Sequence, residues 1–248
     1  MSHVGTAVTV EESAPALTSH YFQPRAVATV LAGVVGGGLG FLVIHWLHPL
    51  HPLPQLPELG AYPSAALLEQ HTIAETEFRS FNGAMDCGIL GGCLGLLVGL
   101  VASTRRRFLT AAAAGASGAL GGALIGFVVG QVVAYGINHS WQQSLLYSTV
   151  YHALIWGVIG IAVNGAVVAT QNPRQMMGAI LAGIIGGVLG ALAYNSLSSI
   201  MYPMSNLSII TPVTASERLL WIMTCVISLS LCLVFGLRRK QDLRATPR

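Results

Sequence analysis

Histidine side chains gather beside the first long apolar run of the sequence. His45, His48 and His51 are spaced three residues apart, and Asp86 lies near the start of the second apolar run. Imidazole and carboxylate groups are ligands for divalent transition metals such as zinc, copper and nickel. The alternative is a group of interfacial histidines without a ligand, because two prolines interrupt the helix here. The sequence therefore predicts a metal site formed by His45, His48, His51 and Asp86.

A second group of residues has the types that nucleophilic catalysis needs. The motif Gly115-Ala-Ser-Gly118 lies within an apolar run, and the next run contains His152. The motif resembles the Gly-x-Ser-Gly of rhomboid intramembrane proteases, which are also six-span proteins with a serine and histidine dyad. The resemblance covers five or six residues and implies Ser117 as the nucleophile and His152 as its base, since the serine needs a base within hydrogen-bond reach. The alternative is that Ser117 is one more small residue on a glycine-rich helix face.

The elements that carry these residues are apolar helices. Of the 248 residues, 53% are hydrophobic and only 8% are charged, against roughly 25% charged residues in soluble domains. A helix of about 20 apolar residues crosses a hydrocarbon core of about 30 Å. The predicted fold class is therefore all-α: a polytopic membrane helical bundle of six transmembrane helices. They are expected at 26–47, 84–103, 108–137, 147–170, 176–197 and 219–237.

Glycines recur within these runs in the pattern Gly-x-x-Gly-Gly-x-x-Gly. Positions i, i+3, i+4 and i+7 share one face of a helix, so each copy forms a glycine stripe. In lipid, small residues favour helix association because they let two backbones approach closely. We therefore predict glycine-zipper packing, with contacts to the protein's own helices, to partner membrane proteins or to a second copy. The predicted contact glycines are Gly33, Gly36, Gly37, Gly40, Gly88, Gly91, Gly92, Gly95, Gly118, Gly122, Gly126, Gly130, Gly183, Gly186, Gly187 and Gly190.

The positions of the basic residues predict the orientation in the membrane. With a cytoplasmic N-terminus, all lysines and arginines except Arg79 and Arg218 fall on the cytoplasmic side, as the positive-inside rule requires. Trp46, Trp141 and Trp221 then fall near the outer interface, where tryptophans form an aromatic belt. Both termini are thus expected in the cytoplasm, in a plasma or inner membrane.

Three domains follow from this orientation. A cytoplasmic tail, 1–25, precedes the membrane domain, 26–237, and a basic cytoplasmic tail, 238–248, follows it. The longest outer segment, 48–83, begins with repeated prolines that favour an extended chain. From residue 64 to 81, apolar residues at helical spacing predict an amphipathic helix on the outer membrane surface or over the bundle. The alternative is an irregular linker.

The sparse charge inside the predicted spans limits the functions open to the chain. Phosphate-loop and nucleic-acid motifs are absent, no cofactor is indicated, and the lipid bilayer is the first expected partner. The leading hypothesis is a non-enzymatic structural, assembly or accessory component of a membrane complex. The alternative is a transporter or channel subunit, possibly for a divalent metal, with a water path along Asp86, Gln131, His152 and Asn164. A third is an intramembrane hydrolase built on Ser117 and His152.

Overall fold

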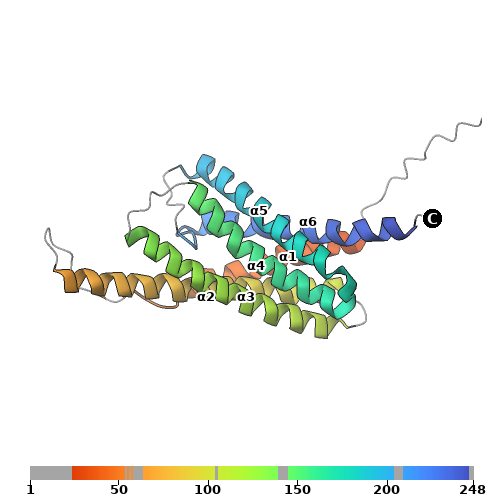
Figure 1. Cartoon of the computed structure of the whole chain (residues 1–248), viewed down its shortest axis with the longest axis horizontal. Helices are drawn as coiled ribbons and strands as arrows, with labels where there is room; N and C mark the ends of the chain where they lie inside the picture. The colour runs from red at the N-terminus through yellow and green to blue at the C-terminus, as the bar shows by residue number, and fades with distance from the viewer. Residues whose placement is uncertain are drawn as a thin grey trace, which may run out of the picture.

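The computed structural model describes residues 24–53, 55, 57, 64–103, 106–138, 145–203 and 209–245. Predictions for 1–23, for Trp141 and for 246–248 lie outside these residues. The described elements are a series of long helices and one short 3-10 turn (Figure 1). In chain order they are α1 (Pro24–Leu47), α2 (Ala65–Ala102), α3 (Arg107–Asn138), α4 (Leu145–Gln171), η1 (Pro173–Gln175), α5 (Met176–Met201) and α6 (Ala215–Ala245).

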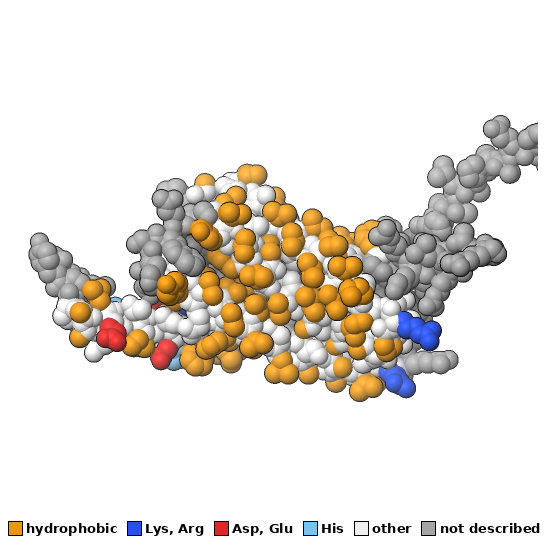
Figure 2. Space-filling model, viewed as in Figure 1, with side chains coloured by type: hydrophobic (Ala, Val, Ile, Leu, Met, Phe, Trp, Pro, Cys, Tyr) orange, Lys and Arg blue, Asp and Glu red, His pale blue; other side chains and the backbone are white. Residues whose placement is uncertain are grey.

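Helices α1 to α6 each contain a stretch long and apolar enough to cross a membrane. Hydrophobic side chains cover the visible flank of the bundle, whereas arginines lie at one end of it (Figure 2). An apolar flank of this extent would be unfavourable in water but suits a lipid environment. The predicted all-α, six-span architecture is therefore confirmed, and the chain is a polytopic integral membrane protein.

The two ends of the bundle differ in character. At one end, which we call the turn end, short connections join α2 to α3 and α4 to α5. The opposite end carries His48 and His152 and the longer connections, and we call it the histidine end. The most extensive helix contacts are α2 with α3 and α4 with α5. The closest pairs are thus joined across the turn end.

Glycines lie where these helices meet. A Cβ added to Gly91 would collide with the carbonyl oxygen of Gly118, and one on Gly83 would lie 2.8 Å from the carbonyl oxygen of Gly126. In the α4–α5 pair, a Cβ on Gly160 would lie 2.9 Å from the Cα of Gly183. Every predicted contact glycine has an atom of a neighbouring helix within 4 Å of such a Cβ. At Gly83, Gly91 and Gly160 the backbones are therefore close enough that side chains would separate them.

Helix α2 is longer than the sequence predicts. It begins at Ala65, where the Ser64 hydroxyl accepts a hydrogen bond from Leu67 N at 3.2 Å, and continues without a break for 38 residues. The predicted amphipathic helix 64–81 is therefore helical, but it is the first half of α2 and not a separate element. Figure 1 shows the beginning of α2 extending beyond the other helices, whereas by Ser80 it is packed against Gly130 of α3. Proline is absent from 65–102, so nothing in the sequence terminates the helix between the two predicted segments.

The position of Trp221 differs from the expectation, and α6 is longer than the span predicted at 219–237. Trp221 is fully buried in the core, against Trp156, instead of lying in an interfacial belt, whereas Trp46 is 81% exposed. The helix α6 continues to Ala245, through most of the predicted C-terminal tail. Burial of Trp221 follows from tertiary packing, because its position near a span end is compatible with either environment.

Candidate functional site

The buried carboxylate of Asp86 and the imidazole of His48 meet at the histidine end. His48 Nδ1 lies 2.8 Å from Asp86 Oδ2, and Asp86 is 1% exposed. Neither atom has a hydrogen bond to any other described group. A buried carboxylate is costly unless another group compensates it, and His48 is the group in direct contact with Asp86.

The chain after α1 runs back along α2 and is held there by side chains of α2. Asn82 Oδ1 accepts from His51 N at 3.0 Å, and Asn82 Nδ2 donates to His51 O at 2.8 Å and to Phe78 O at 2.9 Å. Further along, His71 Nε2 lies 2.8 Å from the Pro57 carbonyl oxygen. We call the described residues of this segment, 48–53, 55 and 57, the strap. The extended conformation that its prolines favour leaves its backbone polar groups free for these bonds.

The four predicted metal ligands do not come together. His45 stacks on Phe41 with ring centroids 5.7 Å apart, and the ring of His51 lies against Phe81 at 5.4 Å. Only His48 and Asp86 meet. Across the part of the chain that the structure describes, no group of three or more His, Cys, Asp or Glu side chains is placed to hold a metal ion. The backbone of His51 bonds to Asn82, and its imidazole lies against Phe81 and not beside the His48–Asp86 pair.

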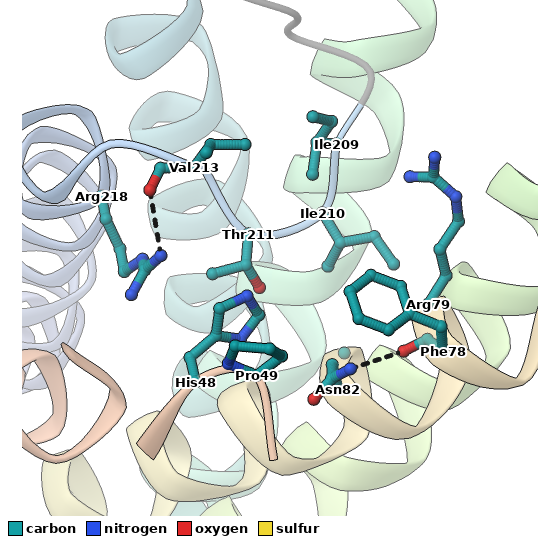
Figure 3. A pocket seen from close by; sticks show the side chains of 11 residues that line it. His48, Pro49, Phe78, Arg79, Asn82, Ile209, Ile210, Thr211, Val213 and Arg218 are labelled. Atoms are coloured by element: carbon teal, nitrogen blue, oxygen red, sulfur yellow. Dashed lines mark hydrogen bonds between the residues drawn. The ribbon is translucent and has the colours of Figure 1, made fainter. Parts of the chain in front are cut away.

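A pocket of about 450 Å³ opens beside the His48–Asp86 pair, between α2, the segment 209–213 and the start of α6 (Figure 3). Its walls combine apolar and basic side chains, and the view places the two arginines on opposite sides. No carboxylate is among the described residues that line it. These are His48, Pro49, Phe78, Arg79, Asn82, Gly83, Ile209, Ile210, Thr211, Val213 and Arg218.

Arg218 shapes the wall of this pocket. It is 5% exposed, and its guanidinium donates from Nε to the Pro212 carbonyl oxygen at 3.0 Å and from Nη2 to that of Val213 at 3.3 Å. Both acceptors precede α6, so Arg218 folds the segment 209–213 back over its own helix. The neighbouring Glu217 contacts Thr214, whose hydroxyl accepts from Glu217 N at 3.3 Å.

A second buried polar group joins α4, α5 and α6. Ser148 Oγ donates to Asn195 Oδ1 at 2.7 Å and lies 3.3 Å from His152 Nδ1. The ring of His152 is fully buried against Tyr194 and Trp221, with centroids 5.1 and 5.8 Å away. These aromatic contacts and the bond to Ser148 hold the imidazole in place, as expected for a structural histidine.

Ser117 and His152 lie at different depths of the bundle. The contact of Gly118 with Val163, and of Thr110 Oγ1 with Thr170 Oγ1 at 3.0 Å, sets the register of α3 against α4. Ser117 is consequently level with the residue next to Val163. Val163 itself is eleven residues from His152 along α4, or about 17 Å at the rise of an α-helix. The structure does not bring the two together.

The four polar residues of the predicted water path lie in different places in the bundle. Asn164 is 3% exposed and lines a cavity of about 10 Å³ with Ser230, in the middle of the bundle. Gln131 is exposed on α3. Asp86 and His152 are both buried. These four side chains therefore do not line one common passage in this conformation.

Comparison with known protein families, curated proteins and solved structures found no match. The candidate site therefore rests on its geometry. Sequence reasoning missed Asn82 and Arg218 as residues of this site. A signal was present for the second, because Arg79 and Arg218 are the two basic residues that break the predicted positive-inside pattern, and both line the pocket.

Proposed function

We propose that the chain is a non-enzymatic integral membrane protein that serves as a structural, assembly or accessory component of a membrane complex. The observation that supports this most directly is the close approach of helix backbones, as at Gly91 and Gly118 of α2 and α3. Glycine-zipper packing of this kind gives a rigid bundle whose interior is filled by protein. The distance between Ser117 and His152 argues against a hydrolytic dyad.

The proposed orientation places both termini in the cytoplasm of a plasma or inner membrane. Arg106 and Arg107 are exposed at the turn end, as is Arg174. Clusters of basic residues at one end of the spans favour the cytoplasmic side. The histidine end, with the strap and the first half of α2, then faces outward.

The first test asks whether water reaches the middle of the bundle. In a variant whose four cysteines are replaced by serine, Asn164→Cys and Ser64→Cys are treated with a water-soluble thiol reagent. A structural component should label at Ser64→Cys and not at Asn164→Cys. Labelling at Asn164→Cys would contradict the proposal and favour transport.

The second test measures the particle that mild detergent extracts from the membrane. Light scattering separates the protein mass from the detergent mass, and one chain contributes 26.0 kDa. We expect a particle that contains further membrane protein or a second copy. A particle of one chain alone, at low detergent and high protein concentration, would contradict an assembly role.

A transporter or channel subunit is the second candidate function. The buried His48–Asp86 pair beside a pocket of about 450 Å³ favours it, because ionisable groups inside membrane spans often mark solute paths. For a divalent metal, calorimetric titration of Zn²⁺ into the wild type and a His45→Ala/His48→Ala variant gives the answer. If the variant releases less heat than the wild type, the result supports metal binding at these histidines. Identical heats for the two proteins would contradict it.

A further inference from the structure

Arg218 is a buried cation that forms no ion pair with a carboxylate among the described residues. Its side chain donates two hydrogen bonds, both to backbone carbonyl oxygens, although a guanidinium has five N–H donors. Among the described residues, no carboxylate oxygen lies within 4.0 Å of the Arg218 guanidinium, the distance of an ion pair. The charge of Asp86 acts on it only from a greater distance. Buried charges are normally paired, but among the described residues no carboxylate is in direct contact with this arginine.

The pocket that Arg218 lines has space for an anionic ligand. A second cation, Arg79, lines its opposite side (Figure 3), and Arg79 keeps its own ion pair with Glu75, Nη2 to Oε1 at 2.6 Å. The Thr211 side chain adds a hydroxyl, and it is 5% exposed. Phe78 and its apolar neighbours form much of the remaining wall. The volume of about 450 Å³ falls in the range of small-molecule sites, roughly 300–1,000 Å³.

We propose that this pocket binds an oxyanion, a phosphate or carboxylate group, attached to an apolar body. Arg218 is the anchoring cation, because a planar guanidinium binds such groups through two parallel hydrogen bonds. Arg79 binds from the opposite wall, and the apolar side chains hold the rest of the ligand. This assigns a ligand site to a protein that the proposed function treats only as a component of a complex.

The location of the pocket allows two sources for this anion. Arg218 is the fourth residue of α6, at the histidine end of the span, which is the depth where lipid headgroups lie. A phospholipid with an anionic headgroup could enter from the bilayer, and a free phosphate or carboxylate compound from water. Both present the same chemistry to Arg218, so the experiment has an arm for each.

The experiment measures binding to purified full-length protein by isothermal titration calorimetry. The probes are short-chain phosphatidylglycerol, inorganic phosphate and, as the uncharged comparison, short-chain phosphatidylcholine. The variants are Arg218→Gln and Arg79→Gln, and Arg174→Gln at the turn end is the matched control. Arg79→Gln keeps the test valid if Arg218→Gln unfolds, because Arg79 has no bond to the segment 209–213.

We expect the wild type to bind phosphatidylglycerol, phosphate or both. Loss of one charge-assisted contact should weaken the affinity about ten- to hundredfold in Arg218→Gln or Arg79→Gln, with Arg174→Gln unchanged. Binding of phosphatidylglycerol alone identifies a lipid headgroup, and binding of phosphate alone identifies a free anion. The proposal is overturned if neither anion binds, if phosphatidylcholine binds as tightly, or if Arg174→Gln weakens binding as much as the pocket variants do.

Discussion

Asp86 shows how a single buried charge is accommodated near the end of a membrane span. The carboxylate is almost inaccessible, and its neighbour is His48, which is anchored at the end of α1. Removing one partner of such a pair leaves the other charge buried without compensation, which costs more than the pair itself contributes. The consequence is that His48 and Asp86 should behave as a unit and not as two independent residues.

The first prediction is a double-mutant cycle on this pair. His48→Ala should lower the free energy of unfolding by about 1–3 kcal/mol, because Asp86 loses the group that compensates its charge. Asp86→Asn should relieve this cost, so that the double variant is more stable than the sum of the single effects. Apparent melting temperatures in detergent give the measurement. Strictly additive effects would show that the two side chains are not coupled.

The side chain of Asn82 holds the strap against α2, because it bonds both the backbone N–H and the backbone carbonyl oxygen of His51. The second prediction is that Asn82→Ala releases the strap while α2 keeps its helix. Hydrogen exchange at the amide of His51 should become faster, because that N–H loses its acceptor. Exchange within α2 beyond residue 90 should not change. The matched control is Ser64→Ala, which removes only the helix cap and should leave His51 protected.

The contact between α2 and α3 gives the third prediction, which uses two adjacent glycines of one motif. A Cβ on Gly91 would collide with the backbone of Gly118, whereas a Cβ on Gly92 would meet the Cβ of Ala119 at 3.4 Å, an ordinary contact. Gly91→Ala should therefore cost about 1–3 kcal/mol of stability through overpacking. Gly92→Ala should be neutral or stabilising, because alanine is the better helix former by about 1 kcal/mol.

Thermal unfolding of the two variants in the same detergent compares them directly. Both substitutions add one methyl group, so any difference between them comes from what that methyl group meets. Equal melting temperatures for Gly91→Ala and Gly92→Ala would show that backbone contact is not what holds α2 against α3.

At the scale of the whole molecule, the fourth prediction concerns orientation. Ser64 lies at the start of α2 beyond the histidine end, and Arg174 lies at the turn end, and both are exposed. In intact cells, an impermeant thiol reagent should modify Ser64→Cys in a cysteine-free variant. Arg174→Cys should react only after permeabilisation, because the basic end is expected in the cytoplasm. The opposite pattern would invert the proposed topology.

Hydropathy was enough to predict the six spans, because length and apolar composition are local properties that each helix carries alone. The candidate site was only partly predictable. The sequence pointed to His48 and Asp86, but the pocket needs the segment 209–213 folded over α6 by Arg218, a contact that no periodicity indicates. The same reason explains the error at Trp221, whose burial depends on neighbours from α4.

Helix α2 has one more consequence for how the molecule responds to its surroundings. Its 38 residues span about 57 Å at 1.5 Å per residue, nearly twice a hydrocarbon core of about 30 Å. Only the first turns of α2 lie beyond the other helices (Figure 1). The same unbroken helix carries Phe78 and Arg79 in the pocket wall and Gly91 in the contact with α3. We therefore expect a tilt of its outer end near Ala65 to move the pocket wall and the α3 contact together, since no break in the helix absorbs it.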